Sequence, residues 1–598
     1  MQIDSIRIYA EVLEQGLDFK KYIQKVGYTC DIQNIYTKKK RGCFSDSDSL
    51  IDRIRKAKDV DVLVTAIADK KEYPILMVEY STAVPTDDHK WQRFDVLFWG
   101  SRFQVPIMKI SPLNKGMEQD FGGGSKITNE LEIYLSNKIK AIYYPIVWEN
   151  DKSSECLDIN TETLSCIAYR DEIFEILKEN LNLFSKTEDY SKYYKMLLVA
   201  YQDKYSEILG KYKDVDLKTV ITNSSRFKWL DDKLCAKINR FGHAMDPDRG
   251  VLYFVNMLLG AKNTIAEIQV NRKKEYNSRG GYKSLFDGIS QEAKLKEYVE
   301  NIIKNQNNVF TTQNALFVFL NALNISEHLQ FEKISEKNFF IKDDVLENFL
   351  LKYPSMTVKS IFYLATELRL TDIDRNIICK ITWNEKIINN YLSFINCDNY
   401  KQTSIKPLNK NQAKEDIITY SCTEIYKKLK HNLLAVSYPG AQGDRCILCG
   451  CGRNALRTYV DIITYKKDEN NIKVFLHECK EKFEHTSADV IKLRNICKNK
   501  DLTEGLFALC QKVAKIQLDE KTEFYSAVGA KYNNSIIDNI DVDYIFLFDI
   551  LNNEKNTIID YSIALINLGL AEEFKSLVDF EGKLKGKLIF DLIYSIDE

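Results

Sequence analysis

Alternating apolar and polar blocks indicate an α/β arrangement at the start of the chain. Residues 59–69 (DVDVLVTAIAD) and 73–81 (YPILMVEYS) are apolar runs separated by a charged turn, which is typical of buried strands. Residues 89–103 then predict a helix, and the apolar residues 105–111 predict a further strand. Strands that alternate with helices indicate a mixed sheet, so we expect an α/β module over residues 1–155.

The middle of the chain, residues 156–405, carries a different pattern. Apolar residues recur at helical spacing in residues 171–184, 191–209 and 345–354. Because this spacing places the apolar residues on one face of a helix, we expect a mainly helical middle region.

Residues 406–598 return to the first pattern. A helix is predicted over residues 413–434, and apolar runs predict strands over residues 456–465, 472–480 and 541–550. The predicted fold class is therefore mixed α/β and α, with α/β modules on both sides of the helical region. The residues of the two modules are not similar enough to establish that one is a copy of the other.

Composition limits the location and the partners of the protein. The 598 residues are 45% hydrophobic and 28% charged, which is the balance of a globular protein. The sequence has no run of about 18 apolar residues, so we expect no membrane partner. The N-terminus lacks the layout of a signal peptide, so we expect a cytoplasmic protein with reduced thiols at its 14 cysteines. A formal net charge of −1 does not decide for or against nucleic acid, because a nuclease needs only a local basic channel.

The end of one predicted strand carries chemistry that a buried strand does not need. Glu478 and Lys480, in VFLHECKEKF, are two residues apart and so face the same side. Asp461 lies on the preceding predicted strand, and antiparallel pairing would bring it close to Glu478. Two converging carboxylates suit Mg²⁺, and a neighbouring lysine can stabilise charge on a phosphate. The pattern favours metal-assisted phosphodiester hydrolysis over a solvated Glu–Lys pair.

Asp461 followed by Glu478-Cys479-Lys480, with a helix on either side, resembles the PD-(D/E)xK nuclease superfamily of restriction-endonuclease type. The resemblance covers roughly residues 412–500 and implies a nuclease module in which Asp461 and Glu478 bind Mg²⁺ and Lys480 assists the nucleophilic water. Residues 486–493 (TSADVIKL) also look like such nucleases. By the same resemblance, an acid on the upstream helix would complete the site and the loop 438–450 would border it, which adds Glu424, Gln442, Asp444 and Arg445.

The N-terminal strands repeat this logic with one departure. Asp61 lies on one predicted strand and Glu79 near the end of the next, but the residue two beyond Glu79 is Ser81 and not lysine. Residues 79–93 resemble, more weakly, an active-site variant of the same superfamily. Either Asp61 and Glu79 form a second metal site with a displaced lysine, or the fold is inactive and kept for binding. The candidates for the displaced group are Lys90, as a catalytic residue, with Gln92 and Arg93.

A basic, glycine-containing stretch lies in the middle region. Residues 271–283 (NRKKEYNSRGGYK) carry five basic residues against one glutamate, and such residues neutralise phosphates and read guanine edges. Either this is a DNA-contact loop or it is a solvated surface loop. The candidate DNA-binding residues here are Arg272, Lys273, Lys274, Arg279 and Lys283.

Two other motifs are read structurally. Cys446, Cys449 and Cys451 lack the second Cys-x-x-Cys of a typical zinc site, so they are interpreted as core cysteines. The stretch FGGGSK, residues 121–126, lacks the spacing of a phosphate-binding loop, so no nucleotide cofactor is expected.

The interpretation that follows is a Mg²⁺-dependent endonuclease acting on double-stranded DNA, a type II-like restriction enzyme with two restriction-endonuclease-like α/β modules. The modules would act as a pseudo-dimer in one chain, or two chains would form a homodimer, with one or two metal ions per site. One alternative is a sequence-nonspecific defence nuclease acting on DNA or RNA. Another is a non-catalytic DNA-binding scaffold that retains nuclease folds, which the departure at Ser81 favours for the N-terminal part.

Overall fold

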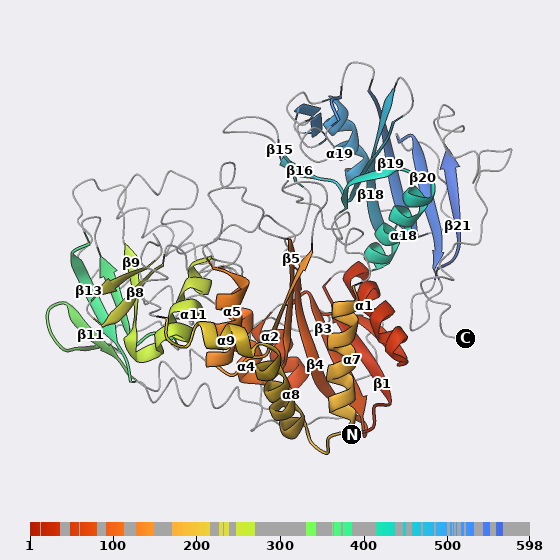
Figure 1. The fold of residues 1–598 in the computed structure, drawn as a ribbon. Coiled ribbons are helices and arrows are strands. Elements are labelled where there is room, and N and C mark those ends of the chain that lie inside the picture. The colour runs from red at the N-terminus through yellow and green to blue at the C-terminus, as the bar shows by residue number, and fades with distance from the viewer. Residues whose placement is uncertain are drawn as a thin grey trace, which may run out of the picture.

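The chain forms a mixed α/β structure with three large sheets in the part that the structure describes (Figure 1). These sheets have six, seven and six strands, and a two-stranded sheet accompanies the last. The computed structural model describes residues 1–11, 13–35, 48–58, 60–80, 91, 93–112, 127–148, 170–215, 227–230, 232–238, 247–269, 331–342, 361–362, 364–371, 375–384, 414–436, 447–449, 457–467, 471–482, 486–498, 503–504, 506–507, 510, 516–518, 522–531, 542–550 and 558–565.

The first sheet has the strand order β2-β1-β3-β4-β5-β6. Antiparallel pairing joins β1 to β3 and β3 to β4, whereas β4, β5 and β6 run parallel. All seven residues of the central strand β3 are buried, as expected for a strand covered on both faces. The strand bounds are β1 (Ser5–Ala10), β2 (Cys30–Asn34), β3 (Val62–Ala68), β4 (Lys71–Tyr80), β5 (Ile107–Pro112) and β6 (Tyr143–Trp148).

Helices surround this sheet, which confirms the α/β expectation for the N-terminal part. The predicted helix over residues 191–209 is two helices, because the helical run is interrupted at Tyr205. The helices are α1 (Leu13–Val26), α2 (Leu50–Ala57), α4 (Asp95–Phe103), α5 (Asn129–Lys138), α7 (Asp171–Ser185), α8 (Tyr190–Lys204) and α9 (Ser206–Lys211).

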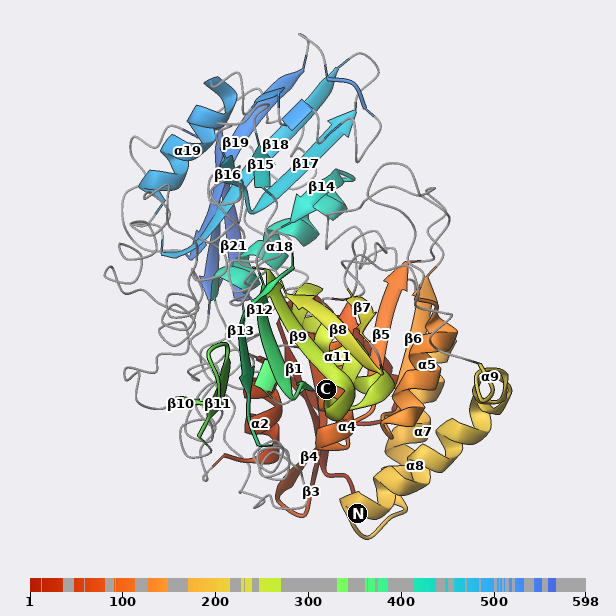
Figure 2. The same cartoon turned by 90° about the vertical axis from the view of Figure 1, so that its left-hand side faces the viewer.

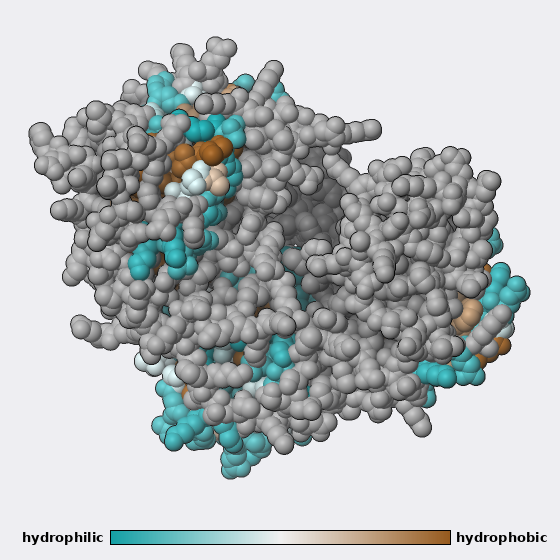
Figure 3. All heavy atoms as spheres, turned by 180° about the vertical axis from the view of Figure 1, so that it is seen from behind, coloured by the Kyte–Doolittle hydropathy of each residue, from teal (hydrophilic) through white to brown (hydrophobic). Residues whose placement is uncertain are grey.

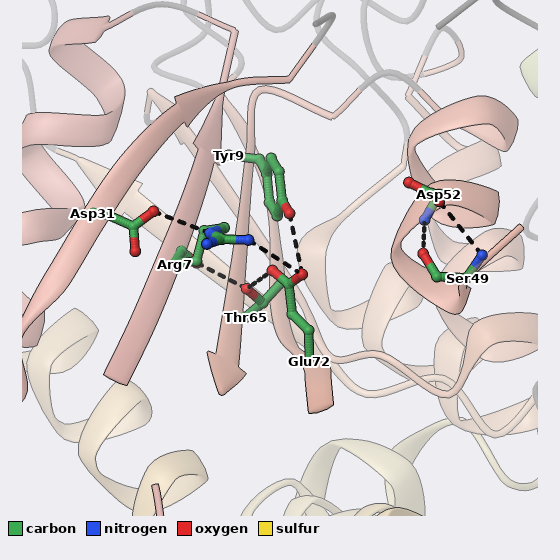
Figure 4. Close-up of polar contacts among 7 residues, drawn as sticks. All are labelled: Arg7, Tyr9, Asp31, Ser49, Asp52, Thr65 and Glu72. Carbon is green, nitrogen blue, oxygen red and sulfur yellow. Dashed lines mark hydrogen bonds and ion pairs between the residues drawn. The ribbon is translucent and has the colours of Figure 1, made fainter. Parts of the chain in front are cut away.

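A polar network crosses four strands of the first sheet, and Figure 4 shows its side chains pointing toward one another. Arg7 Nε lies 3.0 Å from Asp31 Oδ2, and its Nη1 lies 3.6 Å from Glu72 Oε2. Thr65 Oγ1 donates to Glu72 Oε1 at 2.7 Å. These partners sit on β1, β2, β3 and β4, so the network specifies the register of the sheet. In the same view, the side chain of Ser49 caps the first turn of α2.

The middle region holds a seven-stranded sheet with the order β10-β11-β13-β12-β9-β8-β7. The predicted helices over residues 171–184 and 191–209 are confirmed as α7, α8 and α9, whereas this sheet was not predicted. The predicted helix over residues 345–354 lies outside the described residues. The strands of this sheet are short. Three local antiparallel pairs, β7 with β8, β10 with β11 and β12 with β13, are joined into one sheet by pairings between segments distant in sequence, such as β9 with β12. Short strands of this kind give too few residues for a recognisable periodicity in the sequence. The elements are β7 (Phe227–Leu230), β8 (Lys233–Ile238), α11 (Pro247–Leu259), β9 (Thr264–Gln269), β10 (Phe331–Lys333), β11 (Asn338–Ile341), β12 (Glu367–Thr371) and β13 (Ile377–Thr382).

The third sheet has the order β14-β17-β18-β19-β20-β21. Helix α18 lies between this sheet and α1 in Figure 1, and Figure 2 shows α18 beside the third sheet from another side. Leu13 of α1 joins the apolar core under α18. The elements are α18 (Lys414–Lys428), β14 (Asn432–Val436), β17 (Ile462–Lys467), β18 (Ile472–Lys482), α19 (Ser487–Lys498), β19 (Glu523–Lys531), β20 (Tyr544–Ile550) and β21 (Ile558–Leu565).

The predicted strand over residues 456–465 is two strands in two sheets. Its first part is β16 (Arg457–Tyr459), which pairs with β15 (Ile447–Cys449) in the two-stranded sheet, and its second part is β17. Asp461 lies between them and interrupts the run. The two ends of this apolar run pair with strands of different sheets, which the hydrophobic pattern alone does not show.

The first and third sheets share an arrangement of five strands. In the order β1-β3-β4-β5-β6, the four successive pairings are antiparallel, antiparallel, parallel and parallel. The order β14-β17-β18-β19-β20 gives the same four relations. Strands β3 and β4 thus correspond to β17 and β18, the strands that carry the candidate carboxylates.

On the face shown in Figure 3, the described surface residues are mainly hydrophilic, and the hydrophobic ones form small, separate groups. The described helices include none with the length and apolar character needed to cross a membrane.

Candidate active site

The pairing of β17 with β18 brings Asp461 opposite Glu478, as expected for antiparallel neighbours. Ile462 pairs with His477, so the residue before Ile462 faces the residue after His477. The backbone N–H of Cys479 donates to Asp461 Oδ2 at 2.8 Å. One carboxylate oxygen of Asp461 is therefore held by the strand that carries Glu478.

Glu478 is a buried carboxylate whose two oxygens differ in their contacts with the described residues. Its side chain is 2% exposed, and Oε2 lies 2.6 Å from Lys492 Nζ. Oε1 has no hydrogen-bond partner among the described residues. Burial raises the pKa of Glu478 well above its usual range, and the nearby charge of Asp461 raises it further. An additional cation at this oxygen would relieve both effects.

Lys480 extends from the same side of β18, with Nζ 3.6 Å from Asp489 Oδ2. Burial acts to lower the pKa of Lys480, but the carboxylates of Asp461, Asp489 and Glu415 outweigh it, and the net pKa is raised. The ammonium group therefore stays protonated at neutral pH and acts as a hydrogen-bond donor and a positive charge.

Three further charged residues complete this cluster. Lys492 Nζ bridges Glu478 to Asp489, whose Oδ1 lies 3.2 Å away, and both Lys492 and Asp489 belong to α19. Glu415 of α18 accepts a hydrogen bond from the backbone N–H of Glu481 at 3.3 Å. The sequence singled out residues 486–493 but not the side chains of Asp489 and Lys492 within them. Contact between a helix and a strand is decided by tertiary packing, which the sequence pattern does not show.

The structure brings Glu415, and not Glu424, to the cluster. Glu424 pairs with Lys427 at 3.0 Å on the same helix. Nine residues of α-helix place Glu424 about 13.5 Å along the axis from Glu415 and about half a turn around it. The upstream helix does supply an acid to the cluster. That acid is Glu415, near the start of α18, and not the predicted Glu424, near its end.

The first sheet repeats the central geometry at Asp61 and Glu79. Val62 pairs with Val78, so Asp61 faces Glu79 in the same register as Asp461 and Glu478. The backbone N–H of Tyr80 donates to Asp61 Oδ2 at 2.5 Å, which reproduces the bond between Cys479 and Asp461. Glu79 is buried, with 4% of its surface exposed.

Lys58 supplies a lysine to this second cluster. Its Nζ lies 3.1 Å from Glu79 Oε1 and 3.3 Å from Asp95 Oδ1. Asp95 begins α4, the helix that follows β4, just as Asp489 lies in the first turn of α19, which follows β18. Arg93 Nε lies 4.0 Å from Glu79 Oε2, so this candidate from the segment after β4 does approach the glutamate. Lys58 was missed because it precedes both strands, at the end of α2.

Several predicted residues lie outside the described part of the chain. In the N-terminal segment these are Ser81, Lys90 and Gln92. The whole basic stretch 271–283, with Arg272, Lys273, Lys274, Arg279 and Lys283, also lies outside it, as do Gln442, Asp444 and Arg445.

The donor set of the third sheet fits a hard divalent cation. Carboxylate oxygens are the ligands that Mg²⁺ prefers, and Glu478 Oε1 is buried without a partner in the described residues. Among the described residues, four carboxylates and two ammonium groups lie there, a formal excess of two negative charges: Glu415, Asp461, Glu478 and Asp489 against Lys480 and Lys492. In the first sheet the described groups are three carboxylates and two cations: Asp61, Glu79 and Asp95 against Lys58 and Arg93.

Comparison with protein-family models and with curated proteins finds no match to this chain. Assignment of a function therefore depends on the geometry of the two clusters.

Proposed function

We propose that this protein is a Mg²⁺-dependent endonuclease that hydrolyses phosphodiester bonds of double-stranded DNA, as a type II-like restriction enzyme. The observation that carries the proposal is the buried Glu478, which faces Asp461, has one oxygen without a hydrogen-bond partner among the described residues, and shares its face of β18 with the protonated Lys480. Converging carboxylates beside a lysine form the arrangement expected for metal-assisted attack on a phosphate.

In this proposal Asp461 and Glu478 would hold Mg²⁺, which when bound would offset the negative charge of the scissile phosphate. The backbone N–H of Cys479 orients the Asp461 carboxylate. Lys480 donates a hydrogen bond to the attacking water or to a phosphate oxygen, and its charge stabilises the transition state. Lys492 positions Glu478 through the 2.6 Å ion pair.

We further propose that the chain contains two restriction-endonuclease-like modules, at residues 1–155 and 406–598, related to the PD-(D/E)xK superfamily. Three observations support this: the shared five-strand arrangement, the common register of the two Asp–Glu pairs, and the common bond from a backbone N–H to the aspartate. Two unlike modules in one chain would form a pseudo-dimer that cuts both strands of a duplex.

The N-terminal cluster would be catalytic with Lys58 as the lysine beside its carboxylates, in the role that Lys492 has in the third sheet. Lys58 bridges Glu79 and Asp95 as Lys492 bridges Glu478 and Asp489, so a lysine–carboxylate chain is present in both. The same pairing also favours the second candidate, a binding module, because Lys58 already neutralises Glu79 without a metal.

Plasmid cleavage with single-site variants tests both proposals. If each module cuts one strand, Glu478→Ala and Glu79→Ala should each convert supercoiled plasmid to open circle, on opposite strands. Strand-specific sequencing of the nicks identifies the strand. Glu424→Ala is the matched control and should linearise plasmid at the normal rate, because Glu424 lies away from the cluster.

Each other outcome has a defined meaning. Normal linearisation by Glu79→Ala would make the N-terminal part a binding module and would require two chains for double-strand cleavage. Normal cleavage by Glu478→Ala would refute the assignment of the third sheet. With the unmodified protein, discrete fragments indicate a restriction enzyme, a smear a nonspecific nuclease, and no cleavage of DNA or RNA a scaffold.

A further inference from the structure

A second cluster of ligand-type side chains lies on the reverse face of β18. His477 and Cys479 flank Glu478 in sequence and so point to the opposite side of the sheet from it. Cys422 of α18 packs against them, and all three side chains are fully buried. One potential ligand atom from each residue lies within 4.8 Å of the other two.

The hydrogen bonds of His477 orient one ring nitrogen toward the thiols. Nε2 lies 3.4 Å from Cys422 Sγ, while Nδ1 lies 3.0 Å from the hydroxyl of Tyr426, which is hydrogen-bonded to Tyr544. With the proton on Nδ1, His477 donates to Tyr426 and the lone pair of Nε2 faces the two cysteines. Metal-binding histidines are commonly oriented by a second hydrogen bond of this kind.

The spacing of these atoms fits a small thiophilic cation. Tetrahedral Zn²⁺ with ordinary bond lengths places a thiolate sulfur and an imidazole nitrogen about 3.6 Å apart, close to the 3.4 Å between Cys422 Sγ and His477 Nε2. Gly529 of β19 permits this approach, because a Cβ at that position would lie 2.8 Å from Nε2 and 2.9 Å from Sγ. A residue with a side chain at position 529 of β19 would therefore collide with His477 and Cys422.

We propose that Cys422, His477 and Cys479 bind one Zn²⁺ ion through two thiolates and one imidazole. Two thiolates and Zn²⁺ sum to zero charge, whereas Cu⁺ would leave a net negative charge in a fully buried site, which is unfavourable. Binding releases the two thiol protons to solvent. Three protein ligands leave one position of zinc for a small fourth ligand.

This site is chemically distinct from the carboxylate cluster. Sulfur and nitrogen donors select zinc, while the carboxylates on the other face select Mg²⁺. The zinc ion would tie α18 to β18 directly behind Glu478, and so support the strand that carries the proposed metal ligand. Its test uses no cleavage assay, so its failure is distinguishable from failure of the proposed nuclease activity.

Metal analysis of the full-length protein tests the proposal. We expect inductively coupled plasma mass spectrometry of protein purified under reducing conditions with Zn²⁺ supplied to find about one zinc per chain. After unfolding with a chelator and refolding with Co²⁺, thiolate-to-cobalt charge-transfer absorption should appear. Cys422→Ser should lose the zinc, whereas Cys510→Ser, which removes another buried thiol, should retain it.

Three results would overturn the assignment. A metal-free protein without the cobalt band would make the cluster a hydrogen-bonded part of the core. A Cys422–Cys479 disulfide found by mass spectrometry under non-reducing conditions would make it a redox pair. Stoichiometric copper in place of zinc would refute the choice of ion. The metal content of the unmodified protein decides the question even if Cys422→Ser does not fold.

Discussion

Lys492→Met should destabilise the region around Glu478 and at the same time strengthen its binding of Mg²⁺. Lys492 Nζ lies 2.6 Å from Glu478 Oε2 and 3.2 Å from Asp489 Oδ1, so in the metal-free protein it is the cation closest to Glu478 in the described cluster. Methionine keeps the apolar stem of lysine as far as the Cε atom and removes the ammonium group with its charge and hydrogen bonds. The negative charges of Glu478 and Asp461 then face each other without the positive charge of Lys492.

The magnitude follows from the burial of the two partners. Removing one member of a fully buried ion pair costs roughly 3–5 kcal/mol. Glu478 is 2% exposed but Lys492 is 28% exposed, so water screens part of the pair. We expect a loss of about 2 kcal/mol in the metal-free protein. Mg²⁺ replaces the missing charge, so its dissociation constant should fall by up to about 30-fold, the equivalent of the same free energy.

Amide hydrogen exchange is the suitable assay for stability. The five tryptophans, at positions 91, 99, 148, 229 and 383, all precede the third sheet, so intrinsic tryptophan fluorescence does not report on it. Peptides from β18 and α19 should exchange up to about 30-fold faster in the variant without Mg²⁺, and saturating Mg²⁺ should remove most of the difference. Isothermal titration calorimetry gives the dissociation constant directly.

The effect should also depend on pH with a defined sign. Burial and Asp461 raise the pKa of Glu478, so the folded state favours its protonated form. The destabilisation should therefore be small at acidic pH, where Glu478 is neutral, and grow as the pH rises through its folded pKa. Lys482→Met, at the exposed end of the same strand, is the control and should change neither quantity. Unchanged exchange together with unchanged Mg²⁺ affinity in Lys492→Met would refute the reasoning.

Three further predictions concern single groups. Lys480→Ala should lower the cleavage rate by about 10²–10³-fold with little change in the Mg²⁺ titration midpoint, because lysine supplies no metal ligand; a shift as large as that of the Glu478 variant would contradict this. Glu415→Ala should slow cleavage and Glu424→Ala should not, as measured by initial rates on plasmid, and equal rates would remove Glu415 from the site. Arg272→Ala with Lys273→Ala should weaken DNA binding alike on all sequences and reduce the salt slope by about one unit per lost phosphate contact; an unchanged slope would return residues 271–283 to a solvated loop.

Local patterns in the sequence were sufficient for the central strands and for the candidate carboxylates. Runs of apolar residues predicted β3, β4, β5, β18 and β20, because a buried strand is recognised from its own residues. The two-residue spacing of Glu478 and Lys480 placed them on one face, since side chains of a strand alternate. Antiparallel pairing then put Asp461 and Asp61 opposite their glutamates, as predicted.

Only the tertiary structure decided which residues surround those carboxylates. Lys492, Asp489, Glu415 and Lys58 come from helices or helix ends, and no local period says which helical side chain meets a given strand. The same holds for the sheet in the middle of the chain and for Cys422 beside His477, which are joined by contacts between distant segments. A strand's own periodicity is local, whereas the partner across a helix–sheet interface is selected by the packing of the whole domain.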